Sequence, residues 1–176
     1  MKAYLRFPVP HHIGAEIQRH AKRHAASIKL SELKPVESLH VTLANFAEIE
    51  NASVALVNKR IEQAFLHQPI VAPTLHIRDF AAFEVPHNGK RLLVALASAE
   101  PLVLWRRFRQ NLLNALSLDA PFADHRLWNP HITLAGLGEK SEIEAELPDL
   151  SWQPDAVELV WKAEYRIHII QPVYKF

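Results

Sequence analysis

The sequence predicts an α+β fold in which two lobes, related by a pseudo-twofold axis, line a central cleft with antiparallel sheets and carry helices outside. Two observations lead to this prediction. Strand-like and helix-like segments recur in a similar order in both halves of the chain, and the string His-x-Thr-Leu occurs twice, at 40–43 and 131–134. A chain of 176 residues suits one domain. We therefore expect residues 1–176 to form a single bilobal domain of interleaved lobes, with one HxTx motif in each.

The first half of the chain combines two kinds of pattern. Alternating apolar and polar side chains at its start indicate a β-strand. Two stretches with apolar residues at helical spacing indicate amphipathic helices, and Ser53 or Asn51 can cap the second. The expected elements are a strand at 3–9, a helix at 12–30, a motif strand beginning at His40, a helix at 53–66 and a strand at 74–85.

The second half repeats much of this order. Asn88-Gly89 lies between two strand-like runs and predicts a hairpin. Pro101 opens a leucine-rich helix. The polar, acidic stretch 139–154 predicts a surface loop or a short helix. The expected elements are strands at 91–98, 130–137, 157–164 and 166–176, and a helix at 101–118.

The two halves also match in spacing. The motif histidines lie 91 residues apart (131 minus 40), and residues 75–78 and 165–168, which both alternate bulky and basic side chains, lie 90 apart (165 minus 75). Such a concealed duplication predicts two equivalent lobes. A twofold relation between the lobes would bring both motif strands to one cleft.

The motif itself has a physical meaning in a β-strand. Side chains alternate faces with a period of two, so the histidine and threonine of each string share one face while the aliphatic residues share the other. The polar pairs are His40 with Thr42 and His131 with Thr133. The chain has only three threonines, which makes two chance occurrences hard to explain.

The amino-acid composition limits the expected cellular location and the kind of ligand. The absence of cysteine excludes disulfides and thiolate metal sites and fits a reducing cytoplasm, where we expect the protein. We expect no membrane association, because no run approaches the roughly 20 apolar residues of a membrane span and the N-terminus lacks a signal peptide's apolar core. A net charge of +1 is a poor footprint for coating long nucleic acid, but it allows a small phosphorylated ligand or one RNA end.

Paired HVTL and HITL strings at this separation resemble the 2H phosphoesterase superfamily, and within it the RNA 2′,3′-cyclic phosphodiesterase branch (2′-5′ RNA ligase, LigT-like). The opening strand, the leucine before His40, the Asn129-Pro130 before His131 and the order of elements all fit, over nearly the whole chain. The resemblance implies an enzyme that hydrolyses or forms 2′-linked phosphate esters without metal or another cofactor. It also implies that His40, Thr42, His131 and Thr133 are the functional residues.

The chemistry follows from the residue types. Opening a 2′,3′-cyclic phosphate requires a base to take a proton from water and an acid to protonate the leaving oxygen, and two imidazoles can do both near neutral pH. Threonine hydroxyls would donate hydrogen bonds to the non-bridging oxygens. We assign His131 as the base and His40 as the acid, although the sequence alone does not order them. For ligation the roles reverse.

Other side chains are candidates for binding the substrate. After the second motif the chain has Ala135-Gly136-Leu137, where the cyclic phosphodiesterase branch often has an arginine. Strand alternation places basic side chains on polar faces that could supply the cation instead, and we expect Arg6, Arg78 or Arg166 to contact phosphate. A tryptophan just before the second motif could stack on a base or belong to the core. The complete set of binding candidates is Tyr4, Arg6, His76, Arg78, Trp128, Arg166 and His168.

Three functional classes remain open. The first is the metal-independent phosphoesterase, with an RNA 2′,3′-cyclic phosphate end or a small nucleotide as substrate and a monomer as the expected state. The second is a binding module that holds RNA ends or nucleotides without turnover. The third is a metal-dependent hydrolase that uses the surplus histidines, for which no HExxH string or third ligand is evident.

Overall fold

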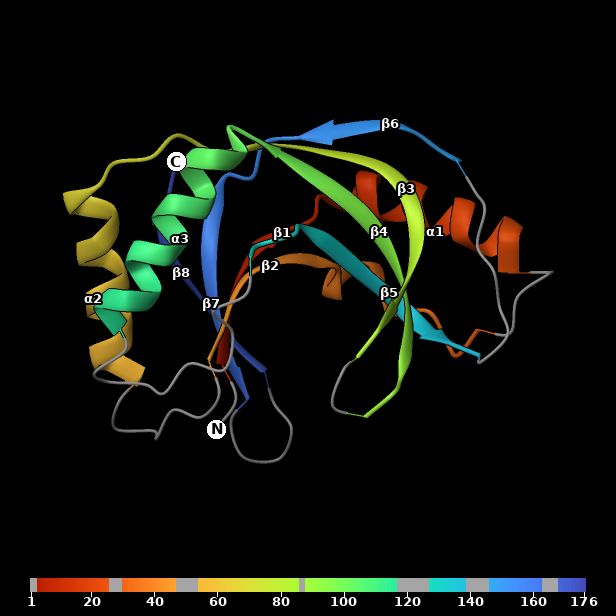
Figure 1. The fold of residues 1–176 in the computed structure, drawn as a ribbon, viewed down its shortest axis with the longest axis horizontal. Helices are drawn as coiled ribbons and strands as arrows, with labels where there is room; N and C mark the ends of the chain where they lie inside the picture. The colour runs from red at the N-terminus through yellow and green to blue at the C-terminus, as the bar shows by residue number, and fades with distance from the viewer. Residues whose placement is uncertain are drawn as a thin grey trace.

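In the computed structural model, the described residues form three helices that pack against a single open sheet of eight strands (Figure 1). The structure describes residues 3–25, 30–46, 54–85, 88–116, 127–138, 146–162 and 168–176. The helices are α1 (His11–Ala25), α2 (Val54–His67) and α3 (Leu102–Leu116), with a short 3-10 turn η1 (Val36–Ser38). The strands are β1 (Ala3–Pro8), β2 (His40–Phe46), β3 (Thr74–Glu84), β4 (Arg91–Glu100), β5 (His131–Leu137), β6 (Glu146–Trp152), β7 (Ala156–Lys162) and β8 (His168–Lys175).

The order of strands in the sheet reflects the twofold relation that the sequence predicts. All neighbours pair antiparallel, in the order β6-β3-β4-β5-β2-β1-β7-β8, so β5 and β2 meet at the centre with three strands beyond each. This order makes β7 the positional equivalent of β3. The predicted equivalence of residues 75–78 with 165–168 is therefore wrong, and residues 165–167 themselves lie outside the described part of the chain.

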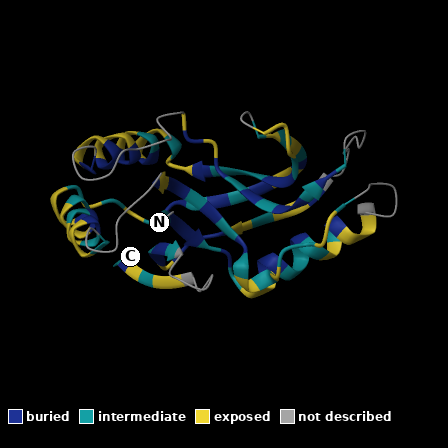
Figure 2. Cartoon of the chain, turned by 90° about the horizontal axis from the view of Figure 1, so that it is seen from below, coloured by how far each residue is buried: buried dark blue, intermediate teal, exposed yellow. Residues whose placement is uncertain are grey.

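The sheet bends into an arch, and the helices lie outside it (Figure 1). Helices α2 and α3 flank the half that contains β7 and β8, while α1 lies against the half that contains β3 and β4. Buried residues gather along the strands and on the inner sides of the helices, whose outer sides are exposed (Figure 2). The α+β prediction is confirmed.

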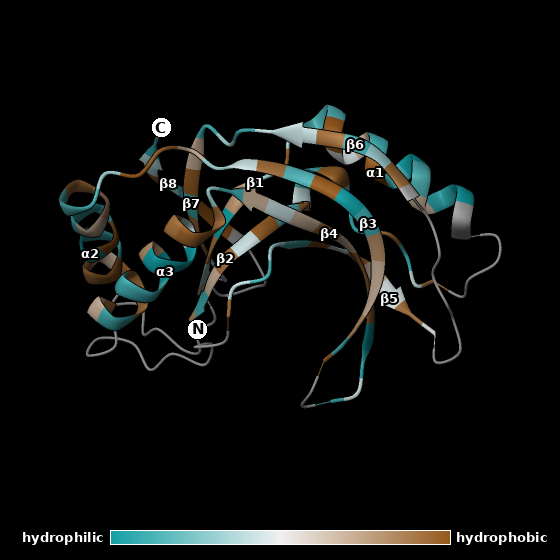
Figure 3. Ribbon diagram, turned by 45° about the horizontal axis from the view of Figure 1, so that its top comes forward, coloured by the Kyte–Doolittle hydropathy of each residue, from teal (hydrophilic) through white to brown (hydrophobic). Residues whose placement is uncertain are grey.

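Each helix is amphipathic because its apolar residues recur at helical spacing. In α2 the fully buried residues are Val57, Ile61 and Phe65, spaced by four. Helix α3 buries Trp105, Phe108 and Leu112 in the same way. Hydrophobic and hydrophilic stretches accordingly alternate along both helices (Figure 3).

The predicted element types hold, with boundaries shifted by a few residues, except over 139–154. There the structure contains strand β6, which pairs with β3 through Leu75↔Trp152 and Ile77↔Leu150. Pro148 argues against a strand in a sequence, but it is tolerated here because β6 is an edge strand. Residues 139–145 lie outside the described residues.

The Asn88-Gly89 hairpin is confirmed. Gly89 has φ of +62°, a left-handed conformation that glycine adopts without steric cost. The Val85 amide donates to the Lys90 carbonyl at 2.8 Å and closes the connection between β3 and β4.

Candidate active site

The two motif strands meet at the middle of the sheet. A single pair, Val41↔Ile132, joins β2 to β5, and both residues are fully buried on the core side. Their neighbours therefore point to the opposite face. In an antiparallel pair this contact places His40 on the side of Thr133 and Thr42 on the side of His131. The topology thus brings the four predicted motif residues together.

Both imidazoles are oriented by the same local hydrogen bond. Nδ1 of His40 lies 2.8 Å from the Ser38 carbonyl oxygen, and Nδ1 of His131 lies 2.9 Å from the Asn129 carbonyl oxygen. A carbonyl oxygen only accepts, so Nδ1 carries the hydrogen in each ring. Nε2 of each imidazole is left to accept or donate a proton.

His40 is half-buried, and positively charged side chains lie near it. Tyr4 stacks on the imidazole, with ring centroids 5.0 Å apart and an interplanar angle of 23°. Burial lowers the pKa of His40 from 6.5 to about 4; the Ser38 hydrogen bond opposes this, while Arg6, Lys34 and His131 add to it. Burial also raises the pKa of the Tyr4 hydroxyl, and Arg6 partly offsets that rise. His40 is therefore neutral at pH 7.

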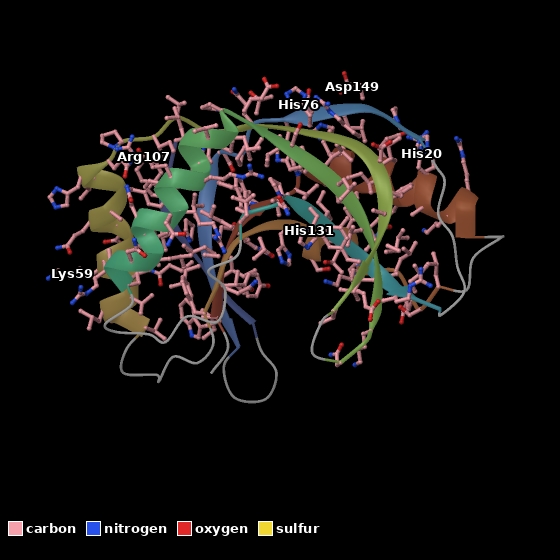
Figure 4. The ribbon with its side chains drawn as sticks, in the orientation of Figure 1. His20, Lys59, His76, Arg107, His131 and Asp149 are labelled. Atoms are coloured by element: carbon pink, nitrogen blue, oxygen red, sulfur yellow. The ribbon has the colours of Figure 1, made fainter. Side chains whose placement is uncertain are left out.

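His131 faces a cavity instead. Its ring contacts Phe83 at a centroid distance of 4.8 Å, tilted by 58°. The adjoining cavity has a volume of about 470 Å³, and side chains from β2, β3 and the segment before β5 line it. Figure 4 places His131 at the centre of the arch. The lining includes Thr42, Asn45, Phe83, Leu127, Trp128 and His131.

Helix α3 and Trp128 fix the main chain around both motifs. The buried Arg109 donates from Nε to the Leu43 carbonyl at 2.7 Å, and the Trp128 indole N–H donates to the Thr42 carbonyl at 2.8 Å. Both acceptors lie where the β1–β2 register shifts and the regular ladder is interrupted.

Arg106 performs the same task for the second motif. It donates to the Trp128 carbonyl at 3.0 Å and to Oδ1 of Asn129 at 3.1 Å, just before His131. Sequence reasoning missed both arginines. The one available signal was Arg109 on the apolar face of its helix, between Phe108 and Leu112.

Trp128 was a candidate for stacking on a base, but the structure buries it with only 5% exposed. Its N–H is already bonded to Thr42, and its ring lies 6.2 Å from that of Phe7. Trp128 is therefore a core residue at the wall of the cavity and leaves little surface for a ligand.

Arg6 reaches the site, but with its charge already compensated. It is opposite Thr42 in the β1–β2 ladder and opposite Glu158 in the β1–β7 ladder. Nε of Arg6 lies 2.7 Å from Oε2 of Glu158, and Arg6 is only 7% exposed. Tyr4 and Arg6 thus both lie near His40, and their role in substrate binding stays a prediction.

His76 and Arg78 do not join this cluster. Figure 4 shows His76 well apart from His131, and its Nε2 lies 3.8 Å from a carboxylate oxygen of Glu100. Arg78 is exposed at a bulge in β3 that breaks the strand alternation on which its prediction rested. Arg166 and the His168 side chain lie outside the described part of the structure.

No group of three or more histidine, aspartate or glutamate side chains within the described ranges is placed to hold a metal ion. In the same ranges, no helix has both the length and the apolar character that a membrane span requires.

Comparison with known proteins gives matches in structure alone. Neither the family models nor the curated sequences match this chain. Among solved structures, TT0787 of Thermus thermophilus is 22% identical with a TM-score of 0.67, and the match covers 100% of this chain and 97% of that one.

Two further structures give comparable matches. E. coli LigT complexed with 3′-AMP is 16% identical with a TM-score of 0.67, over 99% of this chain and 96% of LigT. Kluyveromyces marxianus Usb1 with uridine monophosphate is 13% identical with a TM-score of 0.61, over 97% of both chains. The chain therefore has the same fold as TT0787, LigT and Usb1, as the resemblance of the paired motifs predicts.

Proposed function

We propose that the protein is a metal-independent phosphoesterase that hydrolyses 2′,3′-cyclic phosphates of RNA ends or nucleotides to 2′-phosphates. The observation that carries the proposal is the pair of imidazoles on one face of β2 and β5, each with Nδ1 bonded to a carbonyl and with no hydrogen-bond partner for Nε2 among the described residues. Two such groups supply the base and the acid that the reaction needs. LigT complexed with 3′-AMP and Usb1 with uridine monophosphate have the same fold, which supports a nucleotide substrate.

The difference between the imidazoles favours the reverse of the sequence-based roles. His40 is neutral at pH 7 because burial lowers its pKa to about 4, so its Nε2 is available to accept a proton. Water would give a proton to Nε2 of His40 while its oxygen attacks phosphorus. The P–O3′ bond then breaks, and His131 protonates the leaving 3′ oxygen. The products are a 2′-phosphate and a 3′-hydroxyl. In ligation, a 5′-hydroxyl would take the place of water, and the product would be a 2′-5′ phosphodiester with a 3′-hydroxyl.

The threonines would act on the phosphate itself. Thr42 lies beside His131 and Thr133 beside His40, and both are half-buried on the face of the imidazoles. Their hydroxyls would donate hydrogen bonds to the non-bridging oxygens, where negative charge rests in the transition state.

One assay tests this proposal against the other two classes. The protein is incubated with a 2′,3′-cyclic nucleotide in the presence of EDTA, and the product is analysed. Formation of the 2′-phosphate supports the proposal. Tight binding without turnover would identify a binding module, and turnover that EDTA abolishes would identify a metal-dependent hydrolase.

A further inference from the structure

The electrostatic environment of the motif face contains one cation with no acidic partner among the described residues. Three groups act on His40 with positive charge: Arg6, Lys34 and His131. Arg6 is paired with Glu158 at 2.7 Å. No ion pair joins Lys34 to an acidic side chain within the described ranges, and burial lowers the pKa of its ammonium group.

The backbone geometry fixes Lys34 next to the second motif. Residues 30–34 continue along the edge of β5 beyond its single pair with β2. Leu30 bridges to Leu137, the Ser31 amide donates to the Gly136 carbonyl at 2.9 Å, and the Lys34 amide donates to the Leu134 carbonyl at 2.8 Å. The main chain of Lys34 therefore lies against Leu134, the residue that follows Thr133 in β5.

Two side chains tighten this attachment. Ser31 Oγ accepts the Gly136 amide hydrogen at 2.7 Å, and Gln18 on α1 donates to the Lys34 carbonyl. A Cβ atom at Gly136 would lie only 3.1 Å from Ser31 Oγ, so the segment occupies the space that a side chain at 136 would need. The segment that crowds this position also carries Lys34.

We propose that Lys34 binds the phosphate of the substrate and serves as the cation of the site, on the face shared by His40 and Thr133. This inference rests on the proposed function for the identity of the substrate, but the anion site itself does not depend on turnover. A half-buried ammonium group without a carboxylate partner gains most from an anionic ligand, because a charge-assisted hydrogen bond replaces lost hydration. Arg6, held by Glu158, instead orients the strands beneath the site.

The test uses Lys34→Met and Lys34→Arg in the full chain, with Lys59→Met on the exposed surface of α2 as a matched control. Figure 4 shows Lys59 far from His131. Binding of inorganic phosphate and of 2′-AMP is measured by calorimetry at two salt concentrations. We expect Lys34→Met to weaken both affinities about tenfold or more and to reduce their salt dependence. Lys34→Arg should recover part of the loss, and Lys59→Met should bind as the parent protein does.

A second measurement does not depend on a ligand. The imidazole of His40 is titrated by NMR, and Lys34→Met should raise its pKa because a neighbouring positive charge is removed. Lys59→Met should leave that titration unchanged. A purely structural lysine would not give the loss of phosphate affinity in Lys34→Met, its partial recovery in Lys34→Arg and this change in the pKa of His40 together.

The outcomes separate the two proposals. If the parent protein binds phosphate through Lys34 but does not turn over a 2′,3′-cyclic nucleotide, the anion site stands and the proposed function fails. If the parent turns over substrate and Lys34→Met binds phosphate and 2′-AMP equally well, the assignment of Lys34 is overturned. Absence of phosphate and 2′-AMP binding by the parent protein would also overturn it.

Discussion

The two motif histidines have the same backbone setting and different surroundings. Each begins a strand and donates from Nδ1 to the carbonyl two residues earlier. The half-buried His40 stacks against Tyr4 near positively charged side chains, whereas His131 lies at the wall of a cavity beside Phe83. The local sequence therefore sets the tautomer, and packing from distant segments sets the proton affinity. In the proposed mechanism, these different surroundings assign the base to His40 and the acid to His131.

The largest expected effect comes from removing either imidazole. His40→Ala and His131→Ala should each reduce turnover of a 2′,3′-cyclic nucleotide by about 10² to 10⁴-fold, the range that acid–base groups contribute. Thermal unfolding should remain cooperative, because both rings occupy the face opposite the buried Val41 and Ile132. A variant with nearly the parent rate would contradict the paired mechanism.

The next effect concerns stability at low pH. His40 has a pKa of about 4 in the folded protein and about 6.5 when unfolded, so the unfolded chain binds the proton more tightly. The stability that a neutral His40 allows is fully present above pH 6.5 and decreases as the pH falls towards 4. The decrease in the free energy of unfolding approaches about 3 kcal/mol.

His40→Asn should remove this dependence. Denaturant unfolding at pH 7 and pH 4.5 measures it, and the difference between the two pH values should be smaller for the variant than for the parent. His12→Asn, at an exposed position of α1, is the control. Equal pH dependence in the parent and His40→Asn would show that His40 is not held neutral by burial.

A smaller effect is expected from the arginine that supports the first motif. Arg109→Met leaves the Leu43 carbonyl without its donor and should lower the free energy of unfolding by about 1–3 kcal/mol. Arg107→Met, on the exposed side of the same helix, should change stability by less than about 0.5 kcal/mol. Chemical denaturation compares them, and equal losses would contradict a specific role for Arg109.

The smallest effect is a shift in pH dependence. Tyr4→Ala exposes His40 to water and should raise its pKa, because burial is the main cause of the depression. The acid limb of kcat/KM, which lies below pH 6.5 in the parent, should then move to higher pH. An unchanged acid limb in Tyr4→Ala would mean that the stack does not keep His40 dry.

The sequence was sufficient to predict the fold class and the residues of the motif face. Both depend on short-range periodicity: alternation places histidine beside threonine, and helical spacing marks the buried faces of the helices. The strand β6 was missed because its acidic composition and Pro148 suit a loop, and only pairing with β3 makes it a strand. Local pattern does not contain that tertiary contact.

The sequence could not predict what surrounds the motif. Arg109 lies 66 positions from Leu43, and Lys34 reaches β5 through backbone hydrogen bonds that any residue type could make. Arg78 failed as a candidate because a bulge in β3 breaks the alternation used to place it. The pairing of distant segments and the irregularities of strands determine where these side chains lie. Neither can be recognised from a few neighbouring residues in the sequence.

The single pair Val41↔Ile132 has a mechanical consequence for the molecule. The middle of a sheet is ordinarily its stiffest part, because ladder hydrogen bonds on both sides restrain each strand. Here the junction of β2 and β5 has one ladder pair. The Thr42 carbonyl accepts from the indole of Trp128, and the Leu43 carbonyl accepts from the guanidinium of Arg109. Helix α3 spans this junction instead, because Arg109 holds the Leu43 carbonyl of β2 and Arg106 holds the Trp128 carbonyl just before β5. The relative position of the two imidazoles therefore depends on one helix that is bonded to both motif segments.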